Sequence, residues 1–210
     1  MRCPHCCFAA TGKGTFMSQE VFDKCLEWAK EFSQMVTLGG GEPTLHPKCL
    51  KWTMDAALAL VDVSLDCGGP AVMVITNGKK SKTAVELAKL SKLGVISAEL
   101  SQDEFHDPID ESTIDAFKRY ASFRDVTQKG RTPVLDVGRA RESHEEGILN
   151  VRDGCACETL FIDPKGDVYG CGCKTKKFGN ILEMNELPRE WWDHAEECFR
   201  ALEENAVLTA

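Results

Sequence analysis

The sequence lacks a long apolar run, and it lacks an excess of basic residues. No apolar stretch approaches the roughly 20 residues needed to cross a bilayer, so we expect a cytoplasmic protein with no membrane contact. The chain carries 25 Lys and Arg against 33 Asp and Glu, a net charge of -8, which argues against general nucleic-acid binding. Its 210 residues allow one main domain and a small appendage, and the 43% hydrophobic content is ordinary for a globular protein.

Cysteine, by contrast, is abundant. The chain contains eleven cysteines, and most lie towards its two ends. Closely spaced cysteines in a reducing cytosol bind metal more often than they form disulfides. Cys3, Cys6 and Cys7 fall within five positions and predict a metal or cluster site. Cys3 and Cys6 form a C-x-x-C pair, whereas Cys7 follows Cys6 directly and is a poor third ligand. The distribution therefore predicts two separate sites.

Helical and strand patterns alternate along most of the chain. Helices are expected at residues 18–33, 47–60, 81–93 and 112–123, and strands at residues 35–38, 71–75, 95–100 and 133–140. This alternation predicts parallel strands joined by right-handed crossovers. In barrels of this kind ligands gather at the carboxyl ends of the strands.

Glycine-rich or polar clusters follow three of the expected strands. Residues 39–43 read Gly-Gly-Gly-Glu-Pro, where missing side chains let a ligand reach the backbone. Residues 76–78 read Thr-Asn-Gly, and residues 101–107 read Ser-Gln-Asp-Glu-Phe-His-Asp. Considered alone, Asn77 and Gly78 form a turn and Asp103 a helix cap.

In this order, the motifs resemble those of the radical S-adenosylmethionine (radical SAM) superfamily. Residues 3–6 match the last part of its C-x-x-x-C-x-x-C motif, and residues 40–43 match its Gly-Gly-Glu-Pro motif. The first family cysteine would fall two residues before Met1, so either the true start lies upstream or this copy is degenerate. The resemblance implies an α/β fold: a partial (β/α)6-type TIM barrel lacking its first strand, with a small C-terminal Cys-rich β-hairpin and helix.

The resemblance also implies the cofactors and their ligands. Cys3 and Cys6, with a third ligand from Cys7 or from outside this sequence, would hold a [4Fe-4S] cluster whose open iron binds SAM. The residues expected around SAM are Gly40, Gly41 and Glu42 at its amino group, Thr76 and Asn77 beside it, Ser101 and Asp103 near its ribose, and Arg139 at its carboxylate. A surface salt bridge is an equally good interpretation of Arg139.

A second cysteine cluster occupies residues 154–179. Cys155 and Cys157 precede a strand at residues 159–162, and Cys171 and Cys173 follow a strand at residues 168–169. A hairpin brings its two ends together, so four thiolates would converge and bind either zinc or an iron-sulfur cluster. This stretch resembles the auxiliary-cluster extensions called SPASM or twitch domains, and the shorter twitch type fits better. The predicted domains are residues 1–145, the partial barrel, and 146–210, the hairpin with a terminal helix.

The sequence thus predicts a radical SAM enzyme of oxidoreductase or transferase type. By resemblance, an electron donor such as flavodoxin or ferredoxin would reduce the cluster, which cleaves SAM to a 5'-deoxyadenosyl radical that takes hydrogen from a peptide or small-molecule substrate. Two alternatives stay open. One is a degenerate barrel that binds a partner without a competent cluster, and the other is a zinc-stabilised binding module that uses only the four late thiols.

Overall fold

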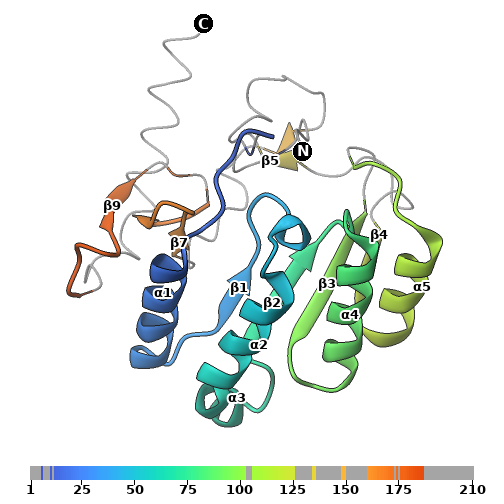
Figure 1. The fold of residues 1–210 in the computed structure, drawn as a ribbon, viewed down its shortest axis with the longest axis horizontal. Coiled ribbons are helices and arrows are strands. Elements are labelled where there is room, and N and C mark those ends of the chain that lie inside the picture. Colours follow the sequence, from blue (N-terminus) through green and yellow to red (C-terminus); the bar gives the residue numbers. More distant parts are fainter. Residues whose placement is uncertain are drawn as a thin grey trace, which may run out of the picture. The chain divides into compact units, whose positions relative to one another are not determined.

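The computed structural model divides the chain into two compact units (Figure 1). One is formed by residues 26–132, and the other by residues 2–25 together with 133–210. The structure describes residues 6, 10, 12–102, 106–125, 134–135, 148–149, 160–172, 174 and 176–186. The domain boundary predicted near residue 145 stays a prediction.

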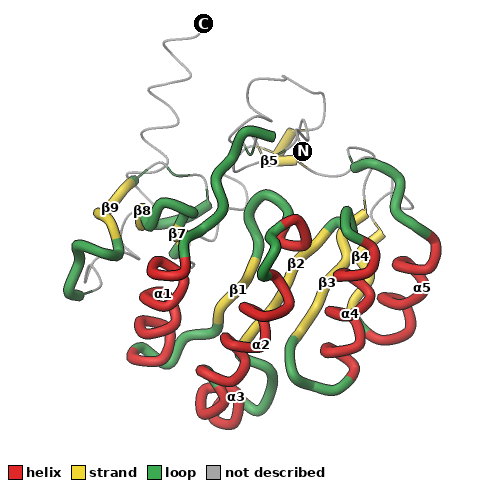
Figure 2. The backbone as a smooth tube through the Cα atoms, viewed as in Figure 1, coloured by secondary structure: helices red, strands yellow, loops and turns green. Residues whose placement is uncertain are grey.

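The first unit contains a parallel four-stranded sheet with strand order β1-β2-β3-β4. The strands are β1 (Val36–Leu38), β2 (Val72–Thr76), β3 (Ser97–Gln102) and β4 (Ser122–Asp125), and the helices between them are α2 (Cys49–Ala59), α3 (Val61–Cys67), α4 (Ser81–Lys92) and α5 (Glu111–Tyr120). Figure 2 shows strand and helix alternating along this unit. Among the described residues the sheet stays open. The predicted α/β class and partial-barrel architecture are confirmed.

One face of this sheet packs against α2, α4 and α5 (Figure 1). Side chains alternate between the faces of a strand. In β2, Val72 and Val74 are fully buried, whereas Ile75, which points to the opposite face, is 36% exposed. Leu87 of α4 and Phe117 of α5 are also fully buried. The core of this unit therefore lies between the sheet and its helices.

Two features of the first unit differ from the expectations. Helix α3 was not expected, and it ends at Gly68, whose φ of 71° is the left-handed conformation that glycine adopts readily. Residues 112–123 were expected to form one helix, but α5 ends at Tyr120 and β4 begins at Ser122. Ser122 pairs with Glu99 of β3, so pairing with the sheet overrides the helical pattern there. The helix prediction was wrong over residues 121–123.

The second unit contains a small antiparallel sheet with strand order β7-β8-β9. Its strands are β7 (Phe161–Ile162), β8 (Asp167–Tyr169) and β9 (Lys177–Asn180). The hairpin formed by β7 and β8 was predicted and is confirmed, whereas β9 was not expected. The described parts also include a parallel pair, β5 (Val134–Leu135) with β6 (Ile148–Leu149).

Helix α1 (Gln19–Glu31) crosses the boundary between the units. It begins as the sequence predicts, because the Val21 N–H donates to the Ser18 hydroxyl oxygen at 3.2 Å. Val21 is buried and approaches the β7-β8 turn of the same unit, where a Cβ added to Gly166 would lie 3.2 Å from its Cγ2. The start of α1 is thereby packed against the hairpin.

Candidate functional site

Glu42 is the centre of a hydrogen-bond network at the carboxyl edge of the parallel sheet. It follows the glycines after β1 and precedes the short 3-10 helix η1 (Pro43–Leu45). Its Oε1 accepts the Thr44 N–H at 3.0 Å and the Thr44 hydroxyl at 2.5 Å. The carboxylate therefore fixes the turn in which it lies, in the manner of a helix N-cap.

The same carboxylate also reaches the loop after β2. Oε1 accepts the Thr76 hydroxyl at 2.5 Å, and Oε2 accepts the Asn77 N–H at 2.9 Å. The Thr76 oxygen in turn accepts the Gly78 N–H at 3.0 Å. Of the predicted SAM-contacting residues, the structure thus brings together Glu42, Thr76 and Asn77.

Thr44 belongs to this network, and the sequence analysis did not identify it. Its side chain is only 3% exposed, and its oxygen also accepts the Lys80 N–H at 3.3 Å. A hydroxyl residue two positions after a carboxylate at the start of a helical turn is the signal that could have indicated it. The hydroxyls of Thr44 and Thr76 each accept a hydrogen bond from the loop after β2 and donate one to Glu42.

The glycines before Glu42 leave backbone accessible. Gly40 has a φ of 100°, which L side chains rarely adopt, and among the described residues no heavy atom lies within 4 Å of a Cβ built on it. The described part of the chain therefore leaves space beside this backbone. Carbonyl oxygens in such a loop can accept hydrogen bonds from an ammonium group, as the SAM amino group requires.

The end of β3 lies next to this edge of the sheet. Leu100 pairs with Thr76, so Ser101 is one residue beyond that pair. Because side chains alternate, Ser101 faces away from the helix-covered side on which Leu100 is buried. Asp103 and Arg139, which were also expected near SAM, lie outside the described residues.

The face of the sheet opposite α2, α4 and α5 carries several polar side chains. Ser97, Glu99 and Ser101 of β3 are all partly exposed there, and Thr37 of β1 is exposed. In a closed TIM barrel this side is filled by bulky branched residues. Here it offers hydroxyl and carboxylate groups to a polar ligand.

Lysines flank the loop after β2. Lys79 pairs with Asp107, which follows β3 in the chain, and this ion pair holds the pKa of the exposed Asp107 carboxyl below its ordinary value. Because both side chains are well exposed, the pair adds little stability. It does place two charges of opposite sign beside the strand ends.

The amino-terminal cysteines are described only in part. Cys6 is partly exposed, and its sulfur accepts the Ala10 N–H at 3.3 Å. Hydrogen bonds to cysteine sulfur are one means by which proteins tune an iron-sulfur cluster. Cys6 thus fits a cluster ligand, whereas Cys3 and Cys7 lie outside the described residues.

Of the late cysteines, only Cys171 is described. It is 7% exposed and follows β8, and its carbonyl oxygen accepts the Lys174 N–H at 3.1 Å. Lys174 has a φ of 58°, and its Nζ lies 5.2 Å from the ring centroid of Phe161 and 4.0 Å from Asp163 Oδ2. These contacts fix the loop that begins at Cys171. The remaining predicted ligands of this site, Cys155, Cys157 and Cys173, lie outside the described residues.

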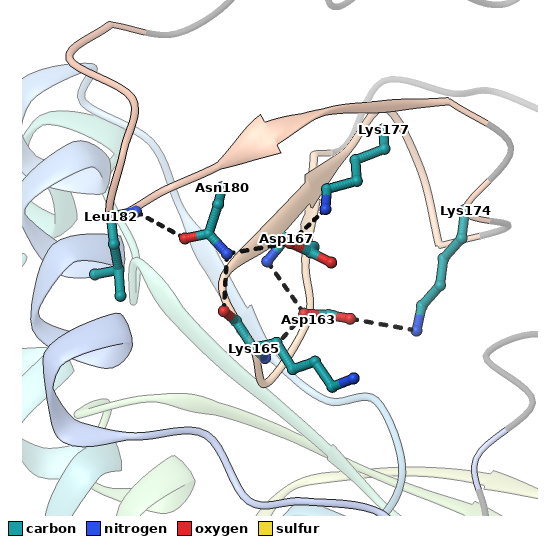
Figure 3. Close-up of polar contacts among 7 residues, drawn as sticks. All are labelled: Asp163, Lys165, Asp167, Lys174, Lys177, Asn180 and Leu182. Carbon is teal, nitrogen blue, oxygen red and sulfur yellow. Dashed lines mark hydrogen bonds and ion pairs between the residues drawn. The ribbon is translucent and has the colours of Figure 1, made fainter.

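A polar network stabilises the turn of the same hairpin (Figure 3). Asp163 Oδ1 accepts the N–H groups of Lys165 at 2.9 Å and Asp167 at 3.1 Å. Asn180 of β9 donates to the Lys165 carbonyl and to the Asp167 carboxylate. Lys177 also donates to Asp167 and lowers the pKa of that carboxyl. The turn is therefore tied to all three strands of the small sheet.

None of the described helices is long and apolar enough to cross a membrane. Within the same residues, no three His, Cys, Asp or Glu side chains lie together as a metal site would need.

The open parallel sheet, with its loops joined at the carboxyl edge, defines an α/β half-barrel whose strand ends can hold a cofactor. A family model described as the Radical SAM superfamily matches residues 1–135. The chain therefore belongs to the radical SAM superfamily. A search of curated proteins gave no match.

Two solved structures are similar to this chain. The crystal structure of BtrN in complex with AdoMet and 2-DOIA has 14% identity and a TM-score of 0.62, covering 97% of this chain and 80% of that chain. The structure of SeMet BtrN in an OPEN conformation has 14% identity and a TM-score of 0.49, covering 90% of this chain and 72% of that chain. At this identity the first likeness supports the fold alone.

Proposed function

We propose that this protein is a radical SAM enzyme that cleaves S-adenosylmethionine reductively and abstracts a hydrogen atom from a substrate. The observation that carries the proposal is the Glu42 network, which joins the Gly-Gly-Glu-Pro loop to the Thr-Asn-Gly loop at the carboxyl edge of the sheet. Family membership supports a [4Fe-4S] cluster and SAM as cofactors. AdoMet is also bound in the BtrN structure that this fold resembles.

The residues of this chain would bind and orient the cofactors. Cys6, with Cys3 and a third ligand from Cys7 or elsewhere, would hold the cluster, and the Ala10 N–H donates a hydrogen bond to the Cys6 sulfur. Backbone carbonyl oxygens of Gly40 and Gly41 would accept the ammonium group of SAM in the open space beside Gly40. The bound cluster and SAM supply the one-electron chemistry and the carbon radical.

Other parts of the site would serve the ribose, the carboxylate and the substrate. Ser101 and Asp103 would contact the ribose, and Arg139 would pair with the SAM carboxylate. The polar sheet face around Glu99 would bind a substrate with hydroxyl or amine groups, either a small molecule or a peptide. Cys155, Cys157, Cys171 and Cys173 would hold an auxiliary iron-sulfur cluster or zinc, and a flavodoxin or ferredoxin would deliver electrons in the cytoplasm.

Anaerobic reconstitution tests this function. We expect at least about 4 iron and 4 sulfide per chain, and release of methionine and 5'-deoxyadenosine from SAM under reductant. Cys3→Ser and Cys6→Ser should each abolish SAM cleavage, whereas Cys67→Ser, at an exposed position of α3, should leave it unchanged.

The alternatives give different results in the same assay. Zinc without iron, together with no SAM binding, would establish the zinc-stabilised module. Iron that binds without any SAM cleavage would establish the degenerate barrel.

A further inference from the structure

The Glu42 carboxylate is almost fully occupied by the protein itself. Oε1 accepts three hydrogen bonds, from the Thr44 N–H, the Thr44 hydroxyl and the Thr76 hydroxyl, and Oε2 accepts one from the Asn77 N–H. An ionised carboxylate offers about four lone-pair sites. Oε1 is therefore fully occupied by the protein, and only Oε2 keeps room for about one further donor.

The four donors come from two loops that are distant in sequence. Thr76 and Asn77 are 34 and 35 residues after Glu42. The Lys80 N–H adds a bond to the Thr44 oxygen, and the Gly78 N–H adds one to the Thr76 oxygen. Both hydroxyls therefore donate to Glu42 and accept from the second loop, so their orientations are fixed.

We propose that Glu42 is a positioning residue that locks the loop after β1 to the loop after β2. The carboxylate holds Gly40 and Gly41 in place, and the glycine carbonyl oxygens receive the ammonium group of the ligand. This assignment rests on the proposed function only for the identity of that ligand. The lock itself is a property of the protein without ligand.

A direct ligand role and a positioning role predict different behaviour of Thr76. If Glu42 bound the ammonium group itself, removing the Thr76 hydroxyl would free a lone pair on Glu42 Oε1. The affinity for the ligand would then be unchanged or improved. If Glu42 positions the loop, Thr76→Val removes one connection of the lock and weakens the ligand as Glu42→Gln does. In Glu42→Gln, the amide NH2 group replaces one of the two acceptor oxygens. It then faces either the Asn77 N–H or the donors of Thr44 and Thr76, and in both orientations an acceptor is lost.

The test is a double-mutant cycle on the cluster-loaded protein, with SAM affinity measured by anaerobic calorimetry. We expect Glu42→Gln and Thr76→Val each to weaken SAM binding by about tenfold, and the double variant to be no more than about twofold worse than either. Thr76→Ser keeps the hydroxyl and should bind SAM within about twofold of the unaltered protein. Glu86→Gln, on the exposed face of α4, is the matched control and should change nothing.

A second readout does not need SAM. Glu42→Gln and Thr76→Val should each lower the thermal midpoint of the ligand-free protein by about 3–8 °C and speed amide exchange at Asn77. Unchanged midpoints and unchanged exchange in both variants would overturn the lock. SAM affinity that is lost in Glu42→Gln but retained in Thr76→Val would assign the carboxylate to the ligand.

Failure of the proposed function gives a distinct outcome. An unaltered protein that binds no SAM while Glu42→Gln still loosens Asn77 would reject SAM as the ligand and retain the lock. Should Glu42→Gln fail to fold, the comparison of Thr76→Val with Thr76→Ser still decides the question, because the serine restores the hydroxyl alone.

Discussion

At the scale of single residues, the sequence identifies the site but not the interactions within it. Gly-Gly-Glu-Pro and Thr-Asn-Gly indicate Glu42, Thr76 and Asn77, and the structure places these three residues together. The pattern does not show that one carboxylate accepts hydrogen bonds from both loops, because that depends on the register of β1 against β2. Thr44 was missed because the three-residue helix η1 is too short to show a periodicity.

Cysteine reactivity is a residue-scale prediction. Burial raises the pKa of the Cys49 thiol to about 11, with a further contribution from the charge of Glu42, and burial raises that of Cys25 to about 12. At pH 8 only about one in a thousand Cys49 side chains is then a thiolate. We expect iodoacetamide to alkylate the exposed Cys67 at least tenfold faster than Cys49 or Cys25, measured by peptide mapping.

The sign of the pH dependence follows from the raised values. A thiol whose pKa is raised stays protonated up to that pKa, so alkylation of Cys49 should rise about tenfold per pH unit from pH 8 towards pH 11. Equal labelling of Cys49 and Cys67 at pH 8 would contradict this account.

At the scale of helices and strands, strong periodicity was a reliable guide and short elements were not. The structure contains α1, α4, β2 and the β7-β8 hairpin close to their predicted positions. Strand β4 was hidden inside a helical pattern because its pairing with β3 depends on residues 23 positions earlier, such as Glu99 with Ser122. Strand β9 contains Lys177, Gly179 and Asn180 in four residues, so neither alternation nor β-propensity marks it.

Two glycines in turns provide a matched test at this scale. Gly78 after β2 has a φ of 72°, and Gly94 after α4 has a φ of 71°. A Cβ at Gly78 would lie 3.1 Å from Ile109 Cγ2 and 3.1 Å from Leu100 Cδ1, whereas a Cβ at Gly94 meets no described atom within 4 Å. We expect Gly94→Ala to lower the free energy of unfolding by about 1–2 kcal/mol through strain alone.

Gly78→Ala carries the same strain and must also displace its neighbours. We expect an additional loss of about 1–3 kcal/mol for that crowding, measured by denaturant unfolding of the two variants side by side. Equal losses in both variants would show that the loop after β2 can move aside.

At the scale of the whole molecule, composition excluded more than it identified. Net charge argued against general nucleic-acid binding and the short apolar runs against a membrane span, but the class of protein came from motif order. The family model covers residues 1–135, and the fold resembles that of BtrN over 97% of the chain. A substrate cannot be deduced from motif order, because the residues that bind it depend on the strand faces and loops of this particular chain.

The metal content of the whole chain tests the late cysteine site. With a [4Fe-4S] cluster at each site, reconstituted protein should contain about 8 iron, and Cys171→Ser should lower this to about 4. With zinc at the late site, the same variant should lose about one zinc and keep its iron. Elemental analysis measures both, with Cys67→Ser as the control.

Loss of neither metal in Cys171→Ser would show that Cys171 is not a ligand. Its burial next to β8 would then be sufficient to explain its position, as for an ordinary small apolar residue.

The tight β7-β8 turn has a consequence for the order of folding. Asp163 and Asp167 are four residues apart, whereas pairing of β1 with β2 requires closure of a segment that contains two helices. Hairpins form in about 1–10 μs, and distant parallel pairings are slower because more chain must be ordered first. We therefore expect the strand that leads to Cys171 to form early, before the parallel sheet is complete.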